Sequence, residues 1–169
     1  MKAEDLRAIQ TPLKERYREN PATALVTLSA SGTLDGSGVS CRVGTGRSLV
    51  EAGLHPATGG SGLQACSGDM LLEALAACAG VTLRAVATAL EIPVRSGAVH
   101  AEGDLDFRGT LGVSKDVAVG FQAIRLRLEL DTDATREQLD TLLKLTERYC
   151  VVLQTIRSST PVSASASSQ

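Results

Sequence analysis

Apolar residues recur along this chain with two periodicities, one typical of helices and one typical of strands. Three segments carry them every three or four positions, as amphipathic or buried helices do: residues 4–19, 70–90 and 135–150. We expect Thr11-Pro12 to break or restart the first helix, because proline has no N–H to donate. Pro93 ends the second, while Thr135 and Gln138 open the third in capping-box register.

The residue pattern typical of strands appears in two pairs of segments. Residues 22–34 and 36–44 are rich in small and β-branched side chains, and Asp35-Gly36 between them is a turn signal, so they predict a hairpin. Residues 94–107 and 122–131 predict a second pair. In the latter, leucine and isoleucine alternate with arginine and glutamate, which indicates one buried and one solvated face. The end of the chain, "TPVSASASSQ", predicts a short strand and a frayed tail.

This order of elements favours an α+β fold, because strict strand–helix alternation, which builds parallel sheets, is missing. We expect antiparallel sheet to cover two central apolar helices whose many alanines let their backbones approach closely. Residues 44–69 are rich in glycine and form a long connection. We divide the chain into an N-terminal helical extension, residues 1–20, and a single domain, residues 21–169.

Composition narrows the function classes. The chain has 169 residues, a net charge of −2 and 2% aromatic residues, so we expect no nucleic-acid binding. Its charged beginning lacks the apolar block of a signal peptide. Glu73 and Arg84 interrupt the long apolar helix. We therefore expect a cytoplasmic protein without membrane insertion.

The cysteines are the candidate reactive residues of this chain. The four cysteines stand at 41, 66, 78 and 150, without zinc-site spacing, so we expect no metal. Cys41 is predicted to be a core residue of a strand, and Cys66 to be exposed and incidental. Cys78 and Cys150 each belong to one apolar helix, which would allow them to meet.

Spacing alone does not decide whether Cys78 is packing or chemistry. A free cysteine is commonly a small buried hydrophobe. As a nucleophile it must ionise, which calls for a cation nearby. Arg42 and Arg47 are the candidates, whereas Arg84 lies off its helix face. Asp69 or Glu73 can hold such an arginine by a bidentate pair, although Asp69 can also simply cap the helix.

Two segments, "GDMLLEALAACAGVTL" and "LTERYCVV", resemble the cysteine motifs of the OsmC/Ohr family, the osmotically inducible and organic hydroperoxide resistance proteins. The resemblance covers about residues 22–166 and is nearest to the OsmC-like branch. It implies an intertwined homodimer, with antiparallel sheets wrapped around two central helices, that reduces organic hydroperoxides. It also implies no cofactor.

By the same resemblance, Cys78 is the peroxidatic thiol, which forms a sulfenic acid, and Cys150 resolves it as a disulfide. An external dithiol, in relatives often a lipoylated protein, reduces that disulfide. Asp69, by register, takes the place of a glutamate that positions the activating arginine.

The chain departs from characterised members at Val151, where they have proline, and in a Gly-Gly-Arg segment, so Arg42 and Arg47 both stay candidates. Three functional hypotheses follow: a thiol peroxidase, a non-enzymatic redox switch or hydrophobic-ligand binder, and a dimeric scaffold in which both cysteines only pack.

Overall fold

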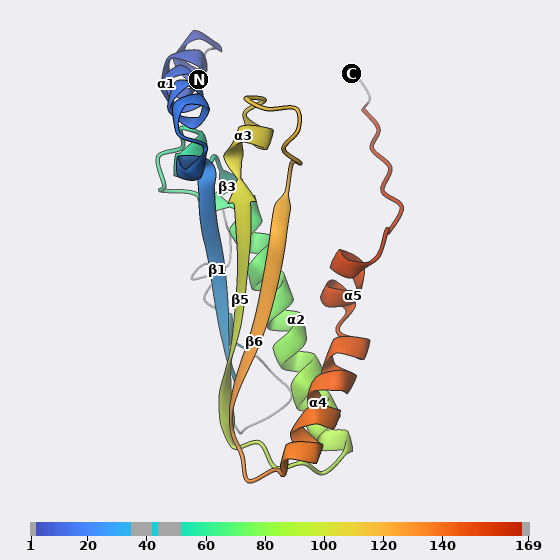
Figure 1. Cartoon of the computed structure of the whole chain (residues 1–169). Coiled ribbons are helices and arrows are strands. Elements are labelled where there is room, and N and C mark those ends of the chain that lie inside the picture. The colour runs from blue at the N-terminus through green and yellow to red at the C-terminus, as the bar shows by residue number, and fades with distance from the viewer. Residues whose placement is uncertain (1–2, 35–41, 44–51, 167–169) are drawn as a thin grey trace.

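The protein combines one main antiparallel sheet with helices on one of its faces (Figure 1). The computed structural model describes residues 3–34, 42–43 and 52–166. In chain order its elements are α1 (Ala3–Glu19), the 3₁₀ turn η1 (Pro21–Ala24), β1 (Leu25–Leu34), β2 (Arg42–Val43), β3 (Ala52–Gly53), the 3₁₀ turn η2 (Pro56–Thr58), β4 (Ala65–Cys66), α2 (Ser67–Ala89), β5 (Ser96–Asp106), α3 (Phe107–Thr110), β6 (Phe121–Asp131), α4 (Arg136–Tyr149) and α5 (Val151–Arg157). The predicted α+β class is confirmed.

The main sheet has the strand order β2-β1-β5-β6, and every neighbouring pair is antiparallel. The first predicted hairpin is present where it is described, because Gly32 pairs with Val43 and Thr33 with Arg42. Its turn at Asp35-Gly36 lies outside the described residues. Within the predicted long connection, β3 and β4 form a separate small parallel pair.

The two faces of the sheet differ as the alternation in β6 predicts. Its even-numbered residues from Ile124 to Leu130 are half-buried and its odd-numbered residues are exposed. On the exposed face Arg125 reaches across to β5, where its Nη1 lies 2.5 Å from Asp104 Oδ2. Such exposed pairs stabilise a sheet only modestly, so the fold depends on the apolar face.

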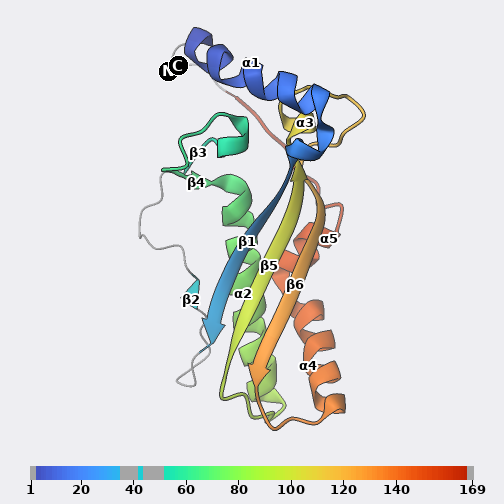
Figure 2. The same ribbon diagram turned by 60° about the vertical axis from the view of Figure 1, so that its left-hand side comes forward.

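That apolar face packs on α2, and α4 and α5 lie beside α2 on the same side of the sheet (Figures 1 and 2). Leu72, Leu75 and Leu83 of α2 are fully buried. By length and composition α2 is also able to cross a membrane, but a core helix passes that test equally well. It ends where Glu91 takes a positive φ of 54°, just ahead of Pro93.

The first helix corrects one prediction. α1 runs through Pro12 without a break. The proline ring lies on the exposed side of the helix, and its last turn is anchored by Tyr17, which is fully buried. The Tyr17 hydroxyl donates to the carbonyl oxygen of Ala57 in η2 at 2.5 Å. Tertiary packing therefore outweighs the cost of one lost helical hydrogen bond.

The structure of the C-terminal segment also differs from its prediction. The predicted strand in residues 160–169 is wrong for the described part, because no strand forms up to residue 166. Val162 is almost fully exposed, so this segment has no apolar contact to hold it against the sheet. The sequence pattern also missed α5, which is separated from α4 by a single residue, Cys150.

Candidate thiol site

The site begins with a break in the helical backbone at Cys150. This residue has extended torsions, φ −69° and ψ 105°, between the last residue of α4 and the first of α5. A break of this kind leaves the first amides of the next helix without helical partners. The Glu147 carbonyl oxygen is taken up by the side chain of Gln154, whose Nε2 donates to it at 2.7 Å.

The freed amides face two sulfur atoms. Cys78 lies half-buried on α2, and the groups that lower the pKa of its thiol through hydrogen bonding are the backbone of Val152, Cys150, Thr82 and the backbone of Val151. Burial by itself raises the pKa of the Cys78 thiol, but these donors together outweigh burial and hold that pKa below its ordinary value. Cys78 is therefore the thiol of the pair that ionises first.

The pKa of the Cys150 thiol is shifted in the opposite direction. It is fully buried, and burial raises the pKa of its thiol to about 11. The backbone amides of Leu153 and Val152 oppose this rise, whereas the neighbouring Cys78 adds to it. Of the two thiols, Cys150 is therefore the one that keeps its proton to the higher pH.

Asp69 does not share this contact. It lies in the first turn of α2, nine residues before Cys78. That spacing amounts to about 13 Å along the axis and half a turn around it. Burial raises the pKa of the Asp69 carboxyl, and the charge of nearby His55 partly offsets the rise. His55 was not a sequence candidate, because nothing in the spacing of a loop residue shows which helix end it will approach.

The predicted arginines are placed only in part. The backbone of Arg42 belongs to β2, but its side chain lies outside the described part of the chain, and Arg47 and Cys41 lie outside it entirely. Arg84 is engaged elsewhere, because its Nη1 donates to the Val94 carbonyl oxygen at 2.5 Å. Which arginine approaches Cys78 stays a prediction.

Three groups of the thiol site were missed at the sequence level. Thr82 stands four residues after Cys78, a spacing that places both on one helix face, so this donor was accessible to pattern analysis. The backbone amides of Val151 and Val152 could not be found by pattern analysis, because nearly every residue type carries the same N–H group. Cys66 also differs from expectation: it is half-buried and precedes the first residue of α2.

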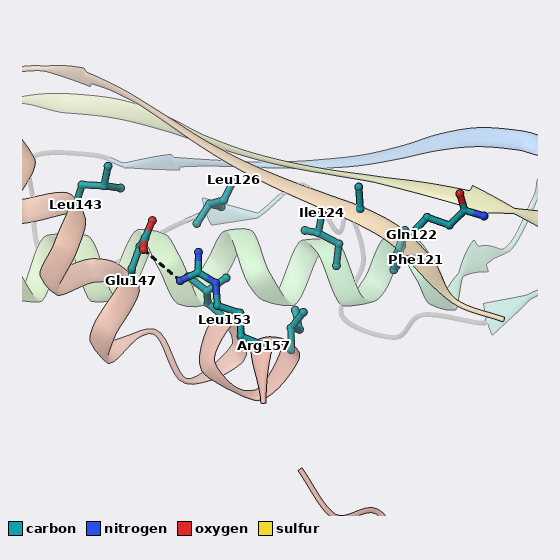
Figure 3. A pocket seen from close by; sticks show the side chains of 10 residues that line it. Phe121, Gln122, Ile124, Leu126, Leu143, Glu147, Leu153 and Arg157 are labelled. Carbon is teal, nitrogen blue, oxygen red and sulfur yellow. Dashed lines mark hydrogen bonds and ion pairs between the residues drawn. The ribbon is translucent and has the colours of Figure 1, made fainter. Parts of the chain in front are cut away.

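A cavity of about 320 Å³ with both apolar and polar walls lies between β6 and the α4–α5 pair (Figure 3). Its walls include Ile124 and Leu126 from the strand and Leu153 from α5. Glu147 and Arg157 also line it and form an ion pair of 3.1 Å, drawn as a dashed line in Figure 3. Leu153 follows the amides that face the thiols, so one short helix contributes to both the site and the cavity.

A second cavity, of about 350 Å³, lies at the start of α2. It is lined by His55 and Phe107, whose rings stack with centroids 4.9 Å apart, and by Cys66. Within the described residues there is no group of three or more His, Cys, Asp or Glu side chains suited to a metal ion. The chemistry that the described site can offer is that of two adjacent thiols.

Fold and site together define an α+β protein in which a thiol of lowered pKa on α2 lies next to a thiol of raised pKa at the break between α4 and α5. The family model for OsmC-like proteins matches residues 60–165, and the chain belongs to this family. α1 and η1 precede the matched region, and so do β1 to β3.

The structure is also similar to the crystal structure of an OsmC-like hydroperoxide resistance protein from Jannaschia sp. CCS1. The TM-score is 0.59 and the sequence identity 16%, with 82% of this chain and 91% of that chain covered. At this identity the likeness shows the fold. Comparison with the curated proteins finds no match.

Proposed function

We propose that the protein is a thiol peroxidase that reduces organic hydroperoxides, with Cys78 as the peroxidatic and Cys150 as the resolving residue. The observation that carries this proposal is the direct contact of the two thiols with their pKa values moved apart. A nucleophile that is ionised and a partner that keeps its proton are the two roles that such a reaction needs.

The first step oxidises Cys78. Its thiolate attacks the distal oxygen of the hydroperoxide, the O–O bond breaks, and the alkoxide leaves and takes up a proton as the alcohol. Cys78 loses two electrons and becomes a sulfenic acid. In the second step the Cys150 sulfur attacks the Cys78 sulfur, a disulfide forms, and the sulfenic hydroxyl leaves with the Cys150 proton as water.

An external dithiol closes the cycle. It supplies two electrons and two protons, becomes a disulfide itself and restores both thiols. We place the protein in the cytoplasm, where thiols are kept reduced, and a lipoylated protein is one such dithiol. We further propose that Arg42 or Arg47 approaches the Cys78 thiolate and that Asp69 orients this arginine.

One experiment tests the two roles. The reduced protein receives one equivalent of cumene hydroperoxide, and the state of each cysteine is mapped by mass spectrometry. We expect a rapid Cys78–Cys150 disulfide in the parent and a trapped sulfenic acid on Cys78 in Cys150→Ser. Cys66→Ser is the matched control and reacts like the parent. Unreacted Cys78 after prolonged exposure refutes the proposal.

The cavity beside β6 supports a second candidate, a redox switch or a binder of hydrophobic ligands. Seven of its ten lining residues are apolar. Three of the ten, Leu153, Ile156 and Arg157, belong to α5, which begins directly after Cys150. Oxidation of Cys150 can therefore reshape the cavity without turnover. Binding of an apolar fluorescent probe, compared between the reduced and oxidised protein, tests this function. It is supported if oxidation changes binding while hydroperoxide consumption stops after one equivalent.

We also propose that the chain forms the homodimer of its family through α2. Met70, Leu71 and Val81 on this helix are 37%, 40% and 40% exposed, although α2 is otherwise the core helix. An exposed apolar helix face is a common oligomer contact. Sedimentation equilibrium should give twice the chain mass, and Val81→Glu should lower it. Val119→Glu, a change at an exposed loop residue, is the control. A monomeric parent overturns this proposal.

A further inference from the structure

The start of α2, beside β3 and β4 in Figure 2, borders a cavity of about 350 Å³ that the thiol site does not use. Small-molecule sites span about 300 to 1,000 Å³, so this cavity is large enough for a ligand. Cys66, one of its lining residues, precedes Cys78 by twelve positions, which is about 18 Å along the helix axis. The cavity is therefore distinct from the pair of thiols. Its apolar walls are formed by Leu54, Leu71, Leu105, Phe107, Val119 and Phe121.

One imidazole supplies a hydrogen-bond donor to this cavity. The Nδ1 atom of His55 accepts a hydrogen bond from the Ala57 N–H at 3.0 Å, so the proton of the neutral ring is on Nε2. Within the part of the chain that the structure describes, this Nε2–H has no hydrogen-bond partner. Since His55 lines the cavity, the donor is available to a ligand.

The His55 ring is held in place before any ligand binds. It stacks on Phe107 with ring centroids 4.9 Å apart and an interplanar angle of 15°. The 3₁₀ turn η2 that follows it is fixed to α1, because the Tyr17 hydroxyl donates to the Ala57 carbonyl oxygen at 2.5 Å. A donor that is already oriented loses little conformational entropy on binding, which favours a specific ligand.

A thiol lines the same cavity. Cys66 is half-buried and free, and although it occupies the N-cap position of α2, its side chain makes no capping hydrogen bond. Its sulfur is therefore not engaged by the helix that it precedes. An oriented N–H donor and a nucleophilic sulfur thus share one apolar cavity.

The lining of the cavity favours a neutral ligand. None of the described residues that line it is an acid, a lysine or an arginine. An anionic ligand would leave water there without finding a cation, which is costly. An apolar cavity with one oriented N–H donor suits a molecule that has an apolar body and a hydrogen-bond acceptor, such as a carbonyl oxygen.

We propose that this cavity is a binding site for small, neutral α,β-unsaturated carbonyl compounds. The His55 Nε2–H donates to the carbonyl oxygen of the ligand, and the Cys66 sulfur adds to its β-carbon. This site is separate from the proposed peroxidase reaction and does not depend on it.

The addition balances without a further reactant. The sulfur forms a bond to the β-carbon, the π bond of the C=C group breaks, and an electron pair moves to the carbonyl oxygen as an enolate. The His55 Nε2–H stabilises this charged oxygen. The proton that the Cys66 thiol loses ends on the α-carbon, so the product is a saturated thioether. No external oxidant or reductant is needed.

The test treats the reduced full chain with cyclohexenone and follows the Cys66 peptide by mass spectrometry. We expect an adduct whose rate of formation saturates as the cyclohexenone concentration rises, because binding precedes addition. A rate that rises linearly throughout, or an absent adduct, overturns the proposal. Cys66→Ser should lose the adduct in this peptide.

Variants of His55 test the donor. His55→Phe keeps an aromatic ring but lacks the N–H, so it should slow the addition by about ten- to a hundredfold, the effect of one hydrogen bond to a charged oxygen. His55→Gln offers an N–H of its own and should restore much of the rate. Both variants lose the acceptor of the Ala57 N–H, so the difference between them reports on the donor. His100→Phe, at the other histidine of the chain, is the matched control.

Methyl methanethiosulfonate, a thiol reagent without a carbonyl group, separates the donor from access to Cys66. His55→Phe and the parent should react with it at equal rates. If His55→Phe slows both reagents alike, or leaves the cyclohexenone reaction unchanged, the role of the donor is overturned.

A protection experiment uses only the parent protein, so it decides the ligand class even where a variant fails to fold. Cyclohexanone, the saturated ketone, should protect Cys66 from methyl methanethiosulfonate, whereas the anion cyclohexanecarboxylate should not. Equal protection by both, or by neither, overturns the proposal. Leu71 lines the cavity and also belongs to the face of α2 proposed as the dimer contact, so every measurement uses the protein in the oligomeric state in which it is purified.

Discussion

Tyr17 is the residue on which the attachment of the N-terminal helix depends, and its hydroxyl allows a quantitative test. The side chain is fully buried in the main apolar cluster, and its hydroxyl donates to the Ala57 carbonyl at 2.5 Å. Tyr17→Phe keeps the ring and leaves that carbonyl without its donor. We expect a loss of about 1 to 2 kcal/mol in the free energy of unfolding. Tyr17→Ala also removes the ring and should cost about 3 to 5 kcal/mol.

The assay is urea unfolding followed by circular dichroism, combined with limited trypsin digestion. For a chain of this size a loss of 1.5 kcal/mol corresponds to a melting temperature lower by about 3 to 6 °C. Trypsin should cleave α1 faster in Tyr17→Phe, because Lys14, Arg16 and Arg18 lie in this helix. The chain offers a matched control in its other tyrosine, Tyr149, which is 56% exposed.

Tyr149→Phe should change the free energy of unfolding by less than about 0.5 kcal/mol. If Tyr17→Phe and Tyr149→Phe unfold at the same urea concentration and are digested at the same rate, the hydroxyl of Tyr17 does not hold α1, and the explanation given for its unbroken course through Pro12 fails. A change confined to trypsin digestion would show that α1 detaches before the domain unfolds, which still confirms the contact.

Three further predictions concern the frame that carries the site. Thr135→Ala removes the capping box of α4 and should cost about 1 kcal/mol in urea unfolding; an unchanged midpoint contradicts this. Gly103→Ala would place its Cβ 2.4 Å from the Phe121 ring, so thermal unfolding should show a destabilisation of about 1 to 3 kcal/mol, and an equal melting temperature would refute the clash. The hydrogen bond from Arg108 holds the pKa of Asp106 below its usual range, against the effect of burial. The stabilisation by this hydrogen bond is present above about pH 4 and is lost as the pH falls through the folded-state pKa of Asp106. Asp106→Asn should therefore weaken the fall of the free energy of unfolding at acid pH, measured by urea unfolding over a pH series.

The two thiols share one apolar environment but differ in the direction of their pKa shifts. Burial of the two thiols favours their neutral forms, and backbone amides oppose this at both of them. Hydrogen bonding outweighs burial only at Cys78. One short interruption of a helix thus separates the pKa values of two identical side chains.

Periodicity along the chain was enough to locate the long elements. The helix around Cys78, the strand from Phe121 to Asp131 and the capping box at Thr135 are where their patterns predict, because each residue there reports a local environment that it shares with its neighbours. The same patterns allowed Cys78 and Cys150 to meet, and they put Cys150 on the face of one helix or just past its end, whereas the structure places it between two helices.

Only the tertiary structure decided the rest. α1 continues through Pro12 because Tyr17 in the same helix is buried against η2, whose Ala57 is 40 residues away in the sequence. The break at Cys150 and the amides of Val151 and Val152 have no signal in residue type, since every residue except proline carries the same N–H. Which backbone groups reach a thiol depends on where two helices come to lie, and that position is set by the packing of the whole domain.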